Sequence, residues 1–208
     1  KKSKKNFLTF YGKTGSLRNL HYKYRFELLK KVCENIDIEI YSDELGRQGY
    51  YKKLIKKNYK QRVVEFLNFF KKKNLKDQFL HEYFPKKCFY PLYGIDMYNK
   101  TFNSCLVLNS HTDLSKNYSA NMRLFETTGI GTGILTEYSK NIHELFDKDE
   151  IITYIDYEDC MNKIEYYKMN LDELNEIALK GQKKTLKNHS SFIRVSEIDN
   201  IIKNNFYS

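Results

Sequence analysis

Residues 105–137, CLVLNSHTDLSKNYSANMRLFETTGIGTGILTE, contain the pattern that decides the fold. The apolar run CLVLN at 105–109 predicts a buried strand, and a polar loop separates it from a helix over about residues 120–128. A second apolar run, GILTE at 133–137, predicts the next short strand. A strand, a helix and a strand in this order are typical of a right-handed crossover between parallel strands.

The N-terminal part repeats this alternation. FLTFY at 7–11 is followed by a loop, by apolar residues at helical spacing from Leu20 to Cys33, and by the alternating IDIEIY at 36–41. This order predicts a second strand–loop–helix–strand unit.

The C-terminal part continues it. A helix over 95–103 is expected before the first strand, and EIITYI at 150–155 is expected to be another strand. Asp156 is a predicted helix cap, and Asn170 with Glu173 resembles a capping box at the start of a further helix. The C-terminal residues 190–204 also have a helical pattern. The sequence therefore predicts an α/β fold with a Rossmann-like, doubly wound parallel sheet.

The chain has 208 residues and no visible linker or repeat, which predicts a single domain over 1–208. No apolar run approaches the roughly 18 residues of a membrane span. The cysteines form no C-x-x-C pair, which predicts buried free thiols in a reducing, cytoplasmic compartment. These cysteines are Cys33, Cys88, Cys105 and Cys160.

The net charge of +10 is unevenly distributed: residues 1–100 have a balance of +14 and residues 101–208 a balance of −4. The basic half indicates either an anionic partner or solvated helix faces. Within it, tyrosines interleave with lysines around residues 52–76. This segment is a candidate for contact with nucleic acid or an anionic membrane.

The loop GKTGS follows the first predicted strand and opens a helix. Its backbone amides at Gly12, Lys13, Thr14 and Gly15, with the helix dipole, are suited to a phosphate. The spacing matches neither the Walker motif nor the dinucleotide fingerprint. A plain tight turn is the alternative.

Arg123 and Glu126 lie about one helical turn apart, just before the glycines. A carboxylate can accept hydrogen bonds from both hydroxyls of a ribose, and a guanidinium matches a phosphate. The alternative is a surface salt bridge followed by a glycine helix cap. Tyr93, with Phe89 and Tyr90, offers stacking on a base or, alternatively, core packing.

The stretches NMRLFETTGIGTGILTEYSKNIHELF and EDCMNKIEYYKMNLDELNEIALKGQKKTLKNHSSFIRV resemble the C-terminal half of a group 1 glycosyltransferase of the spore-maturation type. The resemblance extends from about 90 to 200 and is looser over 7–41. The positions that match its pattern are Asn121, Arg123, Phe125, Glu126, Gly131, Glu144, Leu145, Phe146, His189 and Arg194.

This resemblance implies the GT-B architecture of two Rossmann-like halves, of which this chain would be the donor-binding half without the N-terminal acceptor-binding half. Glu126 would hold the donor ribose. The backbone around Asn121 and Met122 and the GKTGS loop would face the diphosphate, while Arg123 would contact phosphate or support its loop.

The resemblance further implies a metal-independent transferase with no cofactor. Its donor is a nucleotide sugar, with UDP or GDP favoured, and its acceptor is a glycan, a protein or a cell-surface polymer. Expected partners are an N-terminal GT-B half or the inner face of an anionic membrane, with no specific nucleic acid. A nucleotide-binding module without transfer activity is the alternative.

One position departs from the wider group. Retaining enzymes carry a Glu eight residues before the ribose Glu, and here that residue is Tyr118. The stereochemistry therefore stays open, and no catalytic base is assigned. His111 and His21 are candidates because they lie in or near the two loops, although a lone His is more often structural.

Overall fold

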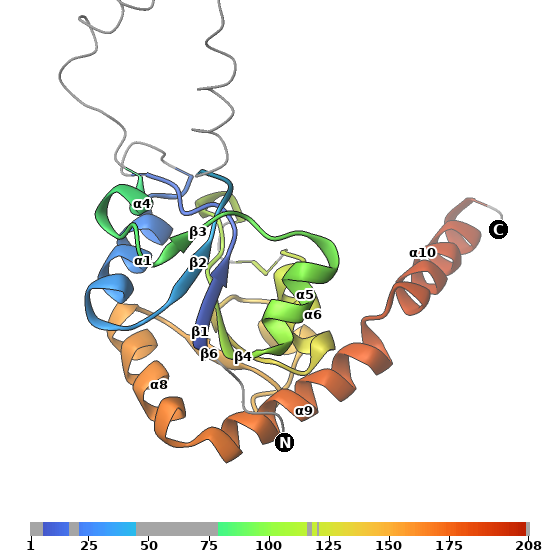
Figure 1. The fold of residues 1–208 in the computed structure, drawn as a ribbon. Coiled ribbons are helices and arrows are strands. Elements are labelled where there is room, and N and C mark those ends of the chain that lie inside the picture. Colours follow the sequence, from blue (N-terminus) through green and yellow to red (C-terminus); the bar gives the residue numbers. More distant parts are fainter. Residues whose placement is uncertain (1–5, 17–20, 45–78, 116–117, 120, 207–208) are drawn as a thin grey trace, which may run out of the picture. The chain divides into compact units, whose positions relative to one another are not determined.

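The computed structural model describes residues 6–16, 21–44, 79–115, 118–119 and 121–206 (Figure 1). Within these residues, six strands form one sheet in the order β3-β2-β1-β4-β5-β6. The pairings of β1 with β2, β2 with β3, β4 with β5 and β5 with β6 are all parallel. The predicted α/β class with a Rossmann-like parallel sheet is confirmed. The chain divides into two compact units, and the predicted single domain stays a prediction.

One unit comprises residues 9–93 and 112–116. Its core is aliphatic and aromatic, with Phe26, Leu29 and Ile40 fully buried. Tyr11, Tyr41 and Phe89 lie in register on adjacent strands, and their ring centroids are 5.4 Å apart in each neighbouring pair. Its elements are β1 (Asn6–Tyr11, of which the first three residues belong to the other unit), α1 (Lys23–Asn35), β2 (Glu39–Tyr41), α4 (Leu80–Tyr83), β3 (Cys88–Phe89) and the 3-10 turn η1 (Asp113–Ser115).

The other unit contains the segment that decides the fold. The helix α9 packs against α6 and β5 (Figure 1). Leu124, Ile134 and Phe146 belong to one buried cluster. Its elements are α5 (Gly94–Phe102), β4 (Ser104–Asn109), α6 (Arg123–Ile130), β5 (Gly133–Glu137), α7 (Ile142–Leu145), β6 (Ile152–Tyr154), α8 (Tyr157–Met169), α9 (Leu171–Asn188) and α10 (Ser191–Phe206).

The predicted helix caps have different outcomes. Asp156 caps α8, because its carboxylate accepts a hydrogen bond from Asp159 N at 2.9 Å. Asn170 does precede α9, but the predicted capping box is wrong. Asn170 Nδ2 donates to the carbonyl of Tyr166, and Glu173 accepts from the Tyr166 hydroxyl. The turn between the helices is so short that Asn170 also ends α8, so both side chains bond to the preceding helix.

The predictions about cysteines and membrane spans can be compared with the structure. All four cysteines are free thiols; Cys33, Cys88 and Cys160 are buried, as predicted, and Cys105 is partly buried. In the part of the chain that the structure describes, no helix combines the length and apolarity needed to cross a membrane. The outermost strands are short, with two residues in β3 and three in β6.

Candidate functional site

The carboxyl ends of β4 and β5 carry a polar network. Asn109, the last residue of β4, donates to Thr136 Oγ1 at 2.9 Å, and its carbonyl accepts from the buried Tyr154 hydroxyl at 3.0 Å. Glu137, the last residue of β5, accepts from Ser110 Oγ and from His111 N, both at 3.1 Å. The strand ends are therefore tied together by side chains at the edge where open α/β sheets bind ligands.

His111 lies within this network and is 6% exposed. Asn121 Nδ2 lies 3.4 Å from its Nδ1, so that nitrogen accepts and the ring proton is on Nε2. Nε2 lies 3.2 Å from both the Glu137 carbonyl and Ser119 Oγ. These contacts occupy both ring nitrogens in this structure. The other candidate base, His21, is exposed in the other unit.

Arg123 and Glu126 face each other in the first turn of α6. Arg123 Nη1 lies 2.8 Å from Glu126 Oε2 and 2.8 Å from Met97 Sδ on α5. Both charged side chains are about one-fifth exposed. Gly131 follows in the left-handed conformation, with φ of +78°, and caps the end of α6. The salt bridge and the glycine cap of the alternative interpretation are thus both present, and the pair is partly exposed and lies at the carboxyl edge of the sheet.

Asn121 and Met122 lead into α6. Asn121 Nδ2 donates to Asn109 Oδ1 at 2.9 Å, which ties this turn to the end of β4. Met122 is the residue before the helix, and its side chain is 72% exposed. Its carbonyl accepts from the amides of Phe125 and Glu126 at 3.1 and 3.0 Å.

Several residues of the family pattern meet in a packing cluster rather than at the polar edge. The rings of Phe125, Phe146 and His189 lie 5.0–5.9 Å from one another. His189 bonds through Nε2 to the Leu145 carbonyl at 2.8 Å, and through Nδ1 to Arg194 Nη2 at 2.6 Å. These residues therefore join α6, α7, α9 and α10, and burial lowers the pKa of His189, with the charge of Arg194 acting in the same direction.

In the other unit, the amides of the GKTGS loop already bind a carboxylate of the protein. Thr14 N and Gly15 N donate to Glu44 Oε1 at 3.0 and 3.1 Å, and Thr14 Oγ1 donates to Oε2 at 3.1 Å. Glu44 is 9% exposed, and its burial raises the pKa of its carboxyl against the opposing effect of these bonds. Lys13 is exposed. Sequence reasoning missed Glu44 because nothing in the motif around it marks a partner for a loop thirty residues away.

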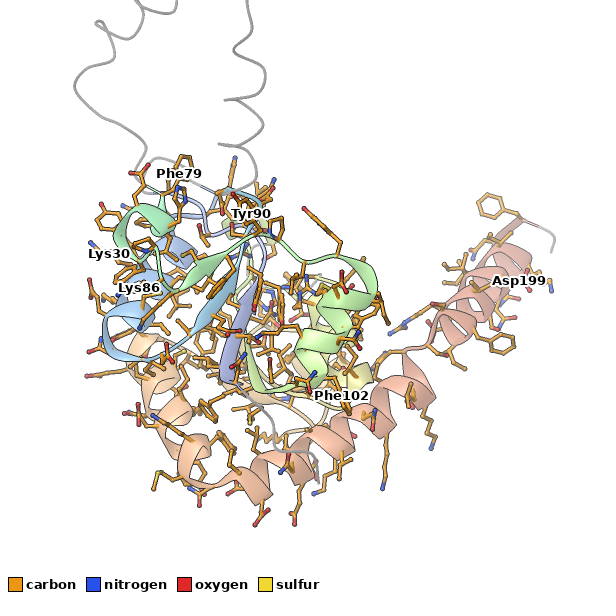
Figure 2. All side chains as sticks on the ribbon, in the orientation of Figure 1. Lys30, Phe79, Lys86, Tyr90, Phe102 and Asp199 are labelled. Atoms are coloured by element: carbon orange, nitrogen blue, oxygen red, sulfur yellow. The ribbon has the colours of Figure 1, made fainter. Side chains whose placement is uncertain are left out.

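The aromatic candidates are exposed. Tyr90 (Figure 2) and Tyr93 are 68% and 71% exposed, so the core-packing alternative is wrong for these two. Tyr118, at the position of the retaining Glu, is 51% exposed. The basic segment 52–76 and its neighbouring tyrosines lie outside the described residues. Among the residues that are described, no group of three or more His, Cys, Asp and Glu side chains has the arrangement of a metal site.

Residues 80–200 match the family described as glycosyl transferase-like. The chain belongs to this family. The match contains α6, the Arg123–Glu126 pair and the packing cluster around His189, and it confirms the resemblance to group 1 glycosyltransferases. No curated protein matches the sequence.

Solved structures similar to this glycosyl transferase-like chain have the GT-B fold. Sucrose-phosphate synthase from Thermosynechococcus elongatus is 9% identical, with a TM-score of 0.60, over 98% of this chain and 46% of that one. HepE from Anabaena, in complex with UDP-glucose, is 11% identical, with a TM-score of 0.59, over 96% and 49%.

A third similar structure is the C-terminal domain of the group 1 glycosyl transferase LpcC from Francisella tularensis. It is 12% identical, with a TM-score of 0.50, over 90% of this chain and 87% of that one. The present chain thus spans about half the length of the first two structures. It is comparable in extent to an isolated C-terminal domain.

Proposed function

We propose that this chain is the donor-binding half of a glycosyltransferase that moves a sugar from a nucleotide sugar to a glycan, protein or cell-surface acceptor. Membership of the glycosyl transferase-like family supports this proposal. So does the fold shared with HepE, whose structures hold UDP-glucose and UDP. The donor would carry UDP or GDP, and the acceptor half would be supplied by another part of the enzyme.

The position of Glu126 carries the proposal. It lies in the first turn of α6, in the loop region that follows the carboxyl end of β4, where parallel sheets bind nucleotides. Its bond to Arg123 uses Oε2, and a carboxylate has about four lone-pair directions, so a ribose diol can bind without loss of the ion pair. In this arrangement Arg123 fixes the orientation of the carboxylate and brings a positive charge towards the diphosphate.

The remaining parts of the donor would meet backbone and aromatic groups. In the unit that carries Glu126, the turn at Asn121 and Met122 would offer amides to the diphosphate. In the other unit, the GKTGS loop is a separate candidate for binding a phosphate, and Tyr93 has an exposed ring suited to stacking on a base. Amides and basic side chains stabilise a departing diphosphate without a metal ion. His111 would orient the strand ends, because its two ring nitrogens already have partners.

Calorimetric titration of the chain with UDP, GDP, CDP and ADP, with and without Mg²⁺, tests the proposal. Selective binding of one diphosphate is expected, and Glu126→Ala should weaken it by about tenfold or more, since hydrogen bonds to a charged group are lost.

Glu197→Ala is the matched control. It removes the carboxylate of another Arg–Glu pair at i,i+3, Arg194 with Glu197 at 2.6 Å on α10, without touching the carboxyl edge. Equal affinity of both variants for the diphosphate would contradict the ribose role. A turnover assay with the intact enzyme would distinguish transfer from a nucleotide-binding module, which remains the second candidate because this chain spans about half the length of its first structural relatives.

A further inference from the structure

The GKTGS loop has the geometry of an anion-binding concavity. Two successive amides, of Thr14 and Gly15, converge on a single oxygen, Glu44 Oε1, at 3.0 and 3.1 Å. Gly15 has φ of +78°, the left-handed conformation that directs successive amides to one side of the backbone. The loop therefore binds negative charge, and the anion bound in this structure belongs to the protein itself.

The surrounding contacts fix this shape before any ligand arrives. Arg25 Nη1 donates to the Lys13 carbonyl at 3.1 Å, and Gly12 N donates to the Tyr41 carbonyl at 3.0 Å. A Cβ at Gly15 would lie 2.3 Å from Tyr22 Cβ, so the backbone approaches that side chain too closely for any other residue. The amides are thus preorganised, and a phosphate would not have to reshape the loop in order to bind.

Glu44 and a phosphate require the same donors. Each amide has one hydrogen, and the Glu44 carboxylate engages both of them together with the Thr14 hydroxyl. Glu44 itself is nearly buried, at 9% exposed. A carboxylate is expensive to bury, because neutral amides compensate only part of its lost hydration. An anion with more charge, whose remaining oxygens stay in water, can therefore compete with Glu44 for these amides.

We propose that Glu44 is an intramolecular competitor that occupies the phosphate position of the GKTGS loop and must leave it when a donor diphosphate binds. This inference rests on the proposed nucleotide-sugar function. It adds a regulatory contact. The loop can bind phosphate only while the carboxylate is absent, so its apparent affinity is proportional to the fraction of time that the loop is free. Occupancy near nine-tenths would weaken binding about tenfold.

Inorganic pyrophosphate is the appropriate probe, because it has neither base nor ribose. Calorimetry would compare the wild-type chain with Glu44→Gln, which keeps the size of the side chain but removes its charge. We expect Glu44→Gln to bind pyrophosphate about tenfold more tightly, as a charge-assisted competitor is replaced by a neutral one. In ¹H–¹⁵N spectra, pyrophosphate should shift the amide signals of Thr14 and Gly15.

Glu39→Gln is the matched control, because it removes the same charge in the same unit from a carboxylate that accepts from the Tyr41 hydroxyl instead. It should leave the pyrophosphate affinity within about twofold of wild type. Thermal unfolding of each variant verifies that the fold is retained. Equal or weaker pyrophosphate binding by a folded Glu44→Gln protein, or binding to neither protein, would overturn the competitor role.

The test separates this inference from the proposed function. If pyrophosphate binding responds to Glu44 but no nucleoside diphosphate binds either protein, the competitor role stands for a phosphate site and the nucleotide-sugar function fails. If a nucleoside diphosphate binds both proteins equally and pyrophosphate binding does not respond, the function stands and the competitor role fails.

Discussion

Two glutamates in the two units hold their negative charge in opposite ways. Glu44 is nearly buried and is held by backbone amides that cannot move away from it. Glu126 is about one-fifth exposed and is held by Arg123, a side chain that carries a full opposite charge. In the first arrangement a rigid loop of amides holds a carboxylate whose burial costs free energy. In the second, an ion pair lies at the carboxyl edge of the parallel strands.

This difference indicates which part of each site is built for an external ligand. In the GKTGS loop the cradle is preformed and the internal carboxylate is the exchangeable part. At the start of α6 the carboxylate itself is the binding group, and Arg123 holds it in place. Substitutions in the GKTGS loop are therefore expected to have larger effects on stability than substitutions in the Arg123–Glu126 pair.

The largest effect is expected from Gly15→Ala. The new Cβ would lie 2.3 Å from Tyr22 Cβ and 2.9 Å from the Tyr22 carbonyl oxygen, at a positive φ. We expect a loss of roughly 2–4 kcal/mol in the free energy of unfolding, measured by urea denaturation. Gly129→Ala in α6 is the control, since its Cβ would make only an ordinary contact of 3.5 Å with Thr185 Cγ2. Equal stability of the two variants would show that the loop is not rigid.

Glu44→Ala should have the next largest effect. It leaves two amides and the Thr14 hydroxyl without their carboxylate partner, which is expected to lower the free energy of unfolding by about 1–3 kcal/mol. Chemical denaturation measures this loss, and added pyrophosphate should restore part of it by occupying the amides. A variant as stable as the wild type would show that water satisfies the loop without any anion.

The pH dependence of stability is a smaller effect with a definite sign. Burial raises the pKa of Glu44 above its ordinary value of 4.5, so the folded state holds this proton more tightly than the unfolded state. The pH-dependent part of the contribution of Glu44 to stability is therefore full below about pH 4.5 and is lost as the pH rises through its folded-state pKa. The hydrogen bonds that Glu44→Ala removes are a separate contribution. The difference in unfolding free energy between wild type and Glu44→Gln should fall over this range in denaturation curves. A difference that rises instead would contradict the assignment.

The smallest effect on stability is expected from Glu126→Ala. An i,i+3 ion pair contributes about 0.2–0.5 kcal/mol, and this pair is partly exposed. The change in unfolding free energy should therefore be similar to that of Glu197→Ala on α10, while only Glu126→Ala alters nucleotide binding. A destabilisation as large as that of Glu44→Ala would assign Glu126 a structural role and contradict the difference drawn between Glu44 and Glu126.

Hydrophobic periodicity predicted much of the fold. GILTE matches β5 at both ends, and CLVLN lies within β4, because short apolar runs between turn signals have few alternatives in a buried parallel sheet. The strand predicted at 36–41 shrinks to Glu39–Tyr41, since the amide of Ile36 bonds back to Val32 and caps α1. Helix ends depend on such local hydrogen bonds, which periodicity does not encode.

The candidate site was less accessible to sequence reasoning. Spacing alone placed Arg123 beside Glu126, because residues three apart on a helix are neighbours. The contact of Thr14 with Glu44 joins positions thirty residues apart, and only the parallel pairing of β1 with β2 brings their following loops together. His111 illustrates the same limit: its partners Ser119, Asn121 and Glu137 come from separate segments, so its lack of a free ring nitrogen could not be predicted.

The short outermost strands have a consequence for association with other molecules. With two residues in β3 and three in β6, each border of the sheet in the described part of the chain offers few backbone donors and acceptors to an incoming strand. Natural proteins shorten edge strands in this way and thereby suppress edge-to-edge pairing with other chains, which leads to aggregation. A strand added at either of these borders would therefore form few backbone hydrogen bonds with the sheet.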